Sequence, residues 1–366
     1  MTKIIAFHLP QFHAIPENDE WWGKGFTEWT NTRKAKPLFK NHNQPREPLN
    51  DNYYNMLDYS TRKWQADLAQ RYGIYGFCYY HYWFNGKMLL EKPVEMLLEE
   101  KDINMPFCFC WANEPWTRAW DGATKEVIMP QEYGGDKEWQ KHFDYLIKFF
   151  KDDRYIKKNN KPVFVIYRTS NIPNCDKMIE FFDNKCKEVG LSGIHIVEEI
   201  NSFQQKPHCE NSKGVIEFEP INTLCNDISF IKKCRRKVKK IYCNITNMDK
   251  NDFYDYDYIW NRIIKRNTKY TNKEKYLGAF IDWDNSARKG KAATIFKGVT
   301  IEKFEKYFRL QLKKANNINS EFLFINAWNE WAEGTYLEPD SKNGYKYLEA
   351  LKRVVDAING EKRDKV

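Results

Sequence analysis

Several kinds of segment are missing from this 366-residue sequence. No stretch approaches the roughly 20 consecutive apolar residues that a membrane-spanning helix needs. No Gly-rich phosphate loop follows the first apolar run, and the nine cysteines show no metal-type spacing. These absences argue against an integral membrane segment, a dinucleotide-binding fold and a structural metal site.

The cysteines are odd in number and scattered through apolar and helical stretches, which favours reduced thiols. The apolar run in MTKIIAFHLPQF is short for a signal-peptide core, and His8 and Pro10 interrupt it. We therefore expect a cytoplasmic protein.

The formal charge of +9 is modest for this length and is carried mainly by lysines along the whole chain. Its densest run is KKCRRKVKK, residues 232–240. No recognisable nucleic-acid-binding motif surrounds it, so we expect no nucleic-acid partner. The run is either a solvated helix face or a peripheral contact with an anionic membrane or polymer.

Eight short, almost continuously apolar runs predict strands that are buried on both faces, as in a parallel sheet. They are residues 3–9, 74–84, 106–113, 162–168, 194–199, 214–220, 276–284 and 321–328. Amphipathic stretches predict helices at 60–72, 87–101, 136–151, 176–189, 301–315 and 345–359. The alternation indicates an α/β protein, a (β/α)8 TIM-like barrel in a single domain over residues 1–366. We expect the long connections 21–55 and 201–266 to be loops on its active face.

In such a barrel, the carboxyl ends of the strands build the site. Polar and aromatic residues follow nearly every predicted strand, and the 13 Trp, 22 Tyr and 24 Phe exceed what a core requires. Amides that grip hydroxyls and rings that stack on sugars predict a glycan-binding cleft. The expected substrate-binding residues are His8, Gln11, Trp29, Tyr80, His81, Trp83, Trp111, Asn113, Glu114, Trp116, Asp282, Asp284, Asn329 and Trp331.

Some of these residues have a structural alternative. His8 and His81 are either site contacts or core histidines with satisfied hydrogen bonds. Asn113 and Glu114 either contact sugar directly or brace the rim of the barrel.

The strongest chemical signal is the segment FLFINAWNEWAEGTYLEP, residues 322–339. Glycosidic cleavage usually needs two carboxyl groups, one protonated and one ionised. Glu330 and Glu333 could enter one pocket if the segment forms a helical turn, with Trp328 and Trp331 as apolar walls. The alternative is that one glutamate is catalytic and the other caps a helix.

Five blocks of the sequence carry a family resemblance. They are HLPQFHAIPENDEWWGKGFTEW, GFCYYHYWFNGK, CWANEPWTRAWDG, KPVFVIYR and WNEWAEGTYLEP. The chain resembles the WbsX-like polysaccharide-biosynthesis proteins, which are related to glycoside hydrolase family 99 and its endo-α-mannosidases.

The resemblance implies a (β/α)8 barrel and retaining cleavage of α-mannosidic bonds without metal or cofactor. It gives Glu330 the role of assisting the sugar's own 2-hydroxyl, which forms a 1,2-anhydro sugar. Glu333 inherits the acid/base role.

Two alternatives remain. WbsX-like proteins are commonly labelled glycosyltransferases of O-antigen or capsule biosynthesis. Asp255-Tyr256-Asp257 and Asp282-Trp283-Asp284 have the Asp-x-Asp form that nucleotide-sugar enzymes use to hold a divalent metal. A non-catalytic glycan-binding protein is the second alternative. We expect a hydrolase or transglycosylase acting on α-linked glycans in a surface-polysaccharide context.

Overall fold

Eight parallel strands form a closed barrel in the computed structural model, which describes residues 1–117, 126–229, 236 and 249–363. The strands are β1 (Lys3–His8), β2 (Gly76–Phe84), β4 (Phe107–Trp111), β8 (Lys161–Ile166), β9 (His195–Ile200), β10 (Gly214–Glu217), β12 (Glu274–Phe280) and β14 (Phe322–Asn326). They pair in chain order, and β1 closes the barrel by pairing with both β2 and β14. The predicted (β/α)8 architecture is confirmed, and each of the eight predicted strands is present.

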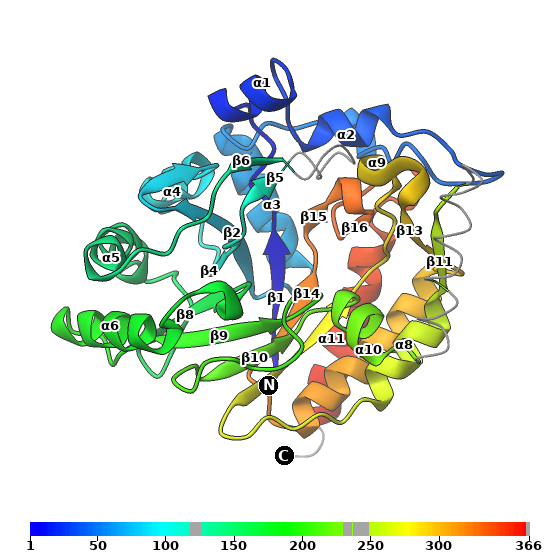
Figure 1. Ribbon diagram of the computed structural model, residues 1–366. Helices are drawn as coiled ribbons and strands as arrows, with labels where there is room; N and C mark the ends of the chain where they lie inside the picture. Colours follow the sequence, from blue (N-terminus) through cyan, green and yellow to red (C-terminus); the bar gives the residue numbers. More distant parts are fainter. Residues whose placement is uncertain (118–125, 230–235, 237–248, 364–366) are drawn as a thin grey trace.

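Helices surround the barrel, as Figure 1 shows. They are α3 (Tyr59–Arg71), α4 (Lys92–Glu99), α5 (Asp136–Phe150), α6 (Cys175–Glu188), α8 (Tyr256–Lys265), α10 (Ile301–Asn317) and α11 (Lys346–Arg363). Their buried positions recur at helical spacing, for example Phe304, Phe308 and Leu312 of α10, so each apolar stripe packs against the barrel.

One predicted helix is wrong in its first part. Residues 87–101 read as a single amphipathic stretch, but Lys87–Leu89 is strand β3, which pairs antiparallel with the end of β2. Asn85 and Gly86 form the turn with positive φ angles of 49° and 89°. Asn-Gly favours this kind of tight hairpin, and helix α4 begins only at Lys92, with Pro93 in its first turn.

The first long connection covers the carboxyl end of the barrel with two short helices, α1 (Pro16–Trp22) and α2 (Glu28–Lys34), and the 3-10 turn η1 (Leu49–Asp51). In Figure 1, β1 runs from the N-terminus toward this region, where α9 (Ser286–Lys289) also lies. The expectation of a loop on the active face is confirmed for this segment.

The second long connection has mixed roles. Residues 202–203 and 221–225 border the carboxyl end of the barrel, whereas α8 is an ordinary surrounding helix that packs against α10. The π-helical turn η4 (Thr223–Asp227) overlaps residues 221–225, and strand β11 (Asp252–Asp255) directly precedes α8. β11 pairs with β13 (Thr294–Lys297), outside the barrel.

The remaining short elements lie in connections. They are β5 (Trp116–Thr117), β6 (Val127–Met129), β7 (Lys157–Lys158), η3 (Thr169–Asn171), η5 (Gly290–Ala292), β15 (Asn329–Glu330), η6 (Trp331–Glu333) and β16 (Thr335–Tyr336).

Close approach of β10 and β12 depends on Gly278. A Cβ atom at this position would collide with the backbone carbonyl oxygen of Glu217. We predict that Gly278→Ala lowers the free energy of unfolding by about 3 kcal/mol or more, since backbone atoms must move apart. Urea denaturation followed by circular dichroism measures the change. The matched control is Gly360→Ala in α11, where a Cβ meets open space and should stabilise by about 0.5–1 kcal/mol. Equal effects of the two substitutions would contradict this account.

Candidate active site

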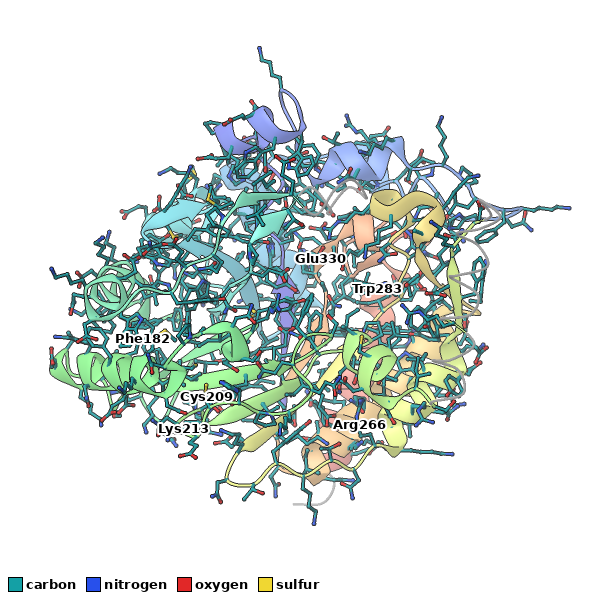
Figure 2. All side chains as sticks on the ribbon, in the orientation of Figure 1. Phe182, Cys209, Lys213, Arg266, Trp283 and Glu330 are labelled. Atoms are coloured by element: carbon teal, nitrogen blue, oxygen red, sulfur yellow. The ribbon has the colours of Figure 1, made fainter. Side chains whose placement is uncertain are left out.

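A cleft of about 450 Å³ opens at the carboxyl end of the barrel. Five of the residues predicted from the sequence line it: Tyr80, Glu114, Trp116, Glu330 and Glu333. Glu330 and Trp283, both labelled in Figure 2, line the cleft. The structure therefore brings the two proposed catalytic glutamates into one hollow.

The segment after β14 presents both carboxylates through a tight hairpin. β15 pairs antiparallel with β16, and the 3-10 turn η6 lies between them. Gly334 ends that turn with a φ of 66°, a left-handed conformation that glycine adopts without strain. The predicted helical turn is confirmed as a single 3-10 turn. The side chain of Glu330 is 8% exposed and that of Glu333 is 24% exposed, so Glu333 stands nearer the opening.

Arg288 of α9 connects three carboxylates at the floor of the cleft. Its Nη1 donates to Glu333 Oε1 at 2.8 Å, and its Nη2 donates to Glu330 Oε2 at 3.2 Å and to Glu28 Oε1 at 2.9 Å. Glu28 is fully buried and also accepts a hydrogen bond from the backbone N–H of Ala332, at 3.1 Å. One guanidinium thus fixes the relative positions of the glutamate pair.

The environment of Glu330 changes its acidity. Burial raises the pKa of this carboxyl group well above its ordinary value, and the Arg288 guanidinium opposes that shift. The negative charges of Glu333 and Glu28 raise the pKa of Glu330 further. A carboxylate with a raised pKa is a stronger base once it is ionised, as a proton acceptor near neutral pH requires.

Arg288 and Glu28 are not among the residues that the sequence predicts. Arg288 is one of 59 Lys and Arg residues, and nothing in its neighbours distinguishes it. Glu28 lies in a block that carries the family resemblance, but its burial depends on the folding of the first connection onto the barrel. Only the three-dimensional arrangement identifies either residue.

Aromatic side chains form the walls of the cleft. They include Tyr80, Trp116 and four rings outside the predicted set: Trp22, Tyr82, Tyr167 and Trp283. Trp116 packs edge-on against Tyr82, with ring centroids 5.3 Å apart. Flat apolar faces beside carboxylates suit the C–H faces and hydroxyl groups of a sugar ring.

Phe203 stands at the edge of the cleft and is 51% exposed. The guanidinium of Arg168 lies 4.0 Å from its ring centroid, on a cation–π contact. Fully buried Glu198 holds the surrounding loop by accepting hydrogen bonds from Thr169 Oγ1 at 2.6 Å and Gln204 Nε2 at 3.0 Å. Phe203 is therefore an anchored exposed ring.

Glu114 also faces the cleft. Burial raises the pKa of its carboxyl group, and Arg168, whose Nη1 lies 3.3 Å from Glu114 Oε2, opposes that shift. Asn113 and Glu114 had two alternatives, direct sugar contact or bracing of the barrel rim. Asn113 braces the rim. Its Oδ1 accepts from the backbone N–H of Arg168 at 2.8 Å, and its Nδ2 donates to the backbone carbonyl of Arg168 at 2.9 Å.

The structure places both predicted histidines in the interior. His8 is fully buried and its Nε2 lies 3.1 Å from Gln65 Oε1. His81 Nε2 lies 2.8 Å from His142 Nε2. Burial lowers the pKa of both His8 and His81 to about 3, which keeps them neutral. The core interpretation of these residues is thus the one that the structure favours.

Three predicted tryptophans also pack away from the cleft. Trp83 Nε1 donates to Glu138 Oε1 at 3.1 Å, and Trp111 Nε1 donates to the backbone carbonyl of Trp83 at 3.1 Å. Trp29 donates to the backbone carbonyl of Tyr54 at 2.9 Å. Their indole N–H groups are satisfied inside the protein, and the structure does not bring these three side chains to the cleft.

Asn329 and Trp331 support the segment that carries Glu330 and Glu333 from behind, and Gln11 is a third predicted residue that lies in the interior. Asn329 is fully buried and forms two hydrogen bonds with the backbone of Leu9, at 2.8 and 3.0 Å. Trp331 stacks on Tyr336, with ring centroids 3.8 Å apart, and donates to Glu338 at 2.7 Å. Gln11 is fully buried, and neither of its amide atoms forms a hydrogen bond within the described residues.

Asp282 and Asp284 face a second hollow beside the cleft. Arg46 Nη2 lies 2.7 Å from Asp282 Oδ2, and His42 Nε2 lies 2.8 Å from Asp284 Oδ2. These contacts lower the pKa of Asp284, against the effect of burial. Across the described ranges, no three His, Cys, Asp or Glu side chains gather closely enough to hold a metal ion.

Two interpretations concern other parts of the chain. The basic run 232–240 lies outside the described residues except for Arg236, which pairs with Asp252 at 2.7 Å and borders the cleft. No helix in the described part of the chain has the length and apolar character that crossing a bilayer requires.

Comparison with known proteins adds to this geometry. The profile of the family described as "Glycosyltransferase WbsX" matches residues 4–351. Two proteins from strains of Xanthomonas campestris pv. campestris, both described as uncharacterized protein WxcX, are 32% identical over 359 residues. Those matches cover 97% of this chain and 50% of each relative, so the chain spans about half their length.

Solved structures share the barrel. The GH99 endo-α-mannosidase from Bacteroides thetaiotaomicron is 14% identical with a TM-score of 0.54, and the match covers 99% of this chain and 98% of that one. A glycoside hydrolase-like protein is 13% identical with a TM-score of 0.59, over 96% of this chain and 93% of that one. At these identities the likeness is one of fold. The profile match over nearly the whole chain shows that it belongs to the WbsX glycosyltransferase family, carbohydrate-active proteins with a barrel like that of glycoside hydrolase family 99.

Proposed function

We propose that this protein is a retaining glycoside hydrolase or transglycosylase that acts on α-linked, mannose-type sugars in a surface-polysaccharide context. The observation that carries the proposal is the pair of Glu330 and Glu333 on one guanidinium, at the floor of an open cleft with aromatic walls. Two carboxyl groups facing one sugar-sized hollow are what glycosidic cleavage usually needs.

In the proposed reaction, Glu330 takes the proton of the sugar's own 2-hydroxyl, and that oxygen attacks the anomeric carbon. Glu333 gives its proton to the leaving oxygen as the glycosidic bond breaks, and a 1,2-anhydro sugar forms. Glu333 then takes a proton from water or from a sugar hydroxyl, whose oxygen opens the three-membered ring. The 2-hydroxyl regains its proton from Glu330. Water as acceptor gives hydrolysis, and a sugar hydroxyl gives transfer.

We also propose a cytoplasmic location. The described cysteines, which include Cys78, Cys108 and Cys110 of the barrel, are free thiols. Reduced cysteines in this number are typical of a reducing compartment.

The first prediction concerns the two glutamates. Glu330→Gln and Glu333→Gln should each reduce turnover of α-mannosides with unactivated leaving groups by roughly 10³-fold or more, since each removes a proton-transfer group. Product analysis by chromatography measures this on a panel of α-mannosides and surface-polysaccharide fragments. Binding should persist in both variants. Full turnover by either variant would exclude the assigned roles.

The second prediction concerns Arg288. Its positive charge lowers the pKa of Glu330, so Arg288→Gln should raise that pKa. Because Glu330 must be ionised to accept a proton, the acidic limb of the kcat/KM profile should move to higher pH, by about one pH unit or more. Arg288→Lys should restore part of the shift. An unchanged acidic limb in a variant with native thermal stability would show that Arg288 has no electrostatic role.

The runner-up is a nucleotide-sugar glycosyltransferase, which the family's description favours. We predict that a chelator leaves turnover unchanged, because Arg46 and His42 already engage the carboxylates of the second Asp-x-Asp triplet. The assay compares α-glycosides and nucleotide sugars as donors, with and without chelator, in wild type and Asp284→Asn. If the protein transfers sugar from a nucleotide sugar, and both the chelator and Asp284→Asn abolish that transfer, the glycosyltransferase reaction is supported instead. Binding without turnover of any donor would indicate a glycan-binding protein.

A further inference from the structure

A second hollow of about 400 Å³ lies beside the cleft. It is enclosed by the connection around residues 39–46, the carboxyl end of β12, β13, the start of α10 and the chain that follows Glu333. Nothing in the proposed mechanism uses it.

The two hollows share a wall that is a single layer of chain. Neighbouring residues of the same segments face opposite sides of it. Trp283, Asn285, Thr294 and Glu333 face the cleft, whereas Asp282, Asp284, Ile295 and Gly334 face the second hollow. A molecule in the second hollow would therefore lie directly behind the catalytic segment.

Charged groups line the second hollow in near balance. The carboxylates are Asp282, Asp284, Glu302 and Asp340, and the cationic side chains are Arg46, Lys297 and Lys342. The carboxylates repel an anionic ligand, and the Arg and Lys side chains repel a cationic one. This balance favours an uncharged ligand that has both hydrogen-bond donors and acceptors.

Several polar groups there have bonding capacity left. Arg46 is 9% exposed, and its Nε has no hydrogen-bond partner within the described residues, although its Nη2 contacts Asp282 at 2.7 Å. A carboxylate offers about four acceptor positions, more than Asp282 uses in its bonds with Arg46 and the backbone N–H of Trp283. The floor can thus accept further O–H donors.

Tyr347 supplies the clearest unused group. Its hydroxyl forms no hydrogen bond in the described part of the chain, while its ring packs edge-on against Phe304 at 5.5 Å. Burial, with the nearby charge of Asp282, raises the pKa of Tyr347, so the hydroxyl keeps its proton at neutral pH. It is a donor beside the floor of the hollow.

Aromatic rings complete the lining, and one of them reaches the catalytic segment. Phe39, Phe296, Tyr336 and Tyr347 all border the hollow. Tyr336 stacks on Trp331, the residue that follows Glu330, at 3.8 Å between ring centroids and 14° between planes. Rings among hydroxyl-binding groups suit a pyranose.

We propose that the second hollow binds a neutral hexose residue, at a site separate from the cleft, and so holds another part of the same glycan. The choice of a sugar as ligand rests on the proposed function. The location of the site rests on the lining described above.

The test counts sugar-binding sites on the full chain. Equilibrium dialysis with radiolabelled methyl α-mannopyranoside should find two molecules per chain at saturation. Methyl glucuronoside, which is anionic, should bind at least tenfold more weakly to the second site, because the floor carboxylates repel it. A single bound mannoside, or equal binding of the glucuronoside at the second site, would overturn the proposal.

Variants assign the two sites. Tyr347→Phe removes one hydroxyl and should weaken one site roughly 5–10-fold, while Trp116→Ala should weaken the other. Tyr345→Phe is the matched control, because Tyr345 is an exposed residue outside the hollow. If Tyr347→Phe binds both mannosides as the wild type does, the second site is not where we place it.

The same experiments distinguish failure of the second site from failure of the proposed function. Turnover of α-mannosides with only one bound mannoside, lost in Trp116→Ala, would remove the second site and leave the proposed function. Two bound mannosides without turnover would remove the proposed function and leave the second binding site.

Discussion

The contact between Arg288 and three glutamates is the interaction on which the site depends. It joins the connection after β1, through Glu28, to the loop after β12 and to the segment after β14. These three segments are distant in the sequence. Without the contact, each would place an unpaired charge at the poorly hydrated floor of the cleft. Removing the cation would leave carboxylates buried together, a situation that costs several kcal/mol in proteins.

The barrel supplies rigidity, and the connections supply chemistry. The fully buried side chain of Asn329 fastens the segment that carries Glu330 to Leu9, directly after β1, by two hydrogen bonds with the Leu9 backbone. The exposed ring of Phe203 depends in the same way on Glu198 beneath its loop. A site that combines fixed carboxylates with anchored aromatic walls is preorganised, which is how a barrel of this class can position a sugar.

The fold could be predicted because each strand is short, apolar and bounded by turn residues, a local pattern. The one wrong helix, at residues 87–101, failed because its hydrophobic spacing outweighed the Asn85-Gly86 turn signal. The residues of the site were harder to predict from the sequence than the strands were. Glu330, Glu333, Glu114, Tyr80 and Trp116 line the cleft. His8, His81, Trp83 and Trp111 lie within β1, β2 and β4 and point outward, toward residues of α3 and α5. Adjacent residues at the end of a strand alternate between faces, and a shift of one position in the expected strand changes the outcome.

The sequence by itself determined the barrel, the family and the presence of two glutamates in a turn after the last strand, because these depend on hydrophobic period and on contiguous motifs. Only the tertiary structure decided which polar residues meet. It selected Arg288 from 59 cationic residues, buried Glu28 beneath the site and turned Asp282 and Asp284 away from the cleft toward Arg46 and His42. The reason is physical: contacts between connections that are far apart in the chain depend on how the loops cover the barrel, and no local pattern records that arrangement.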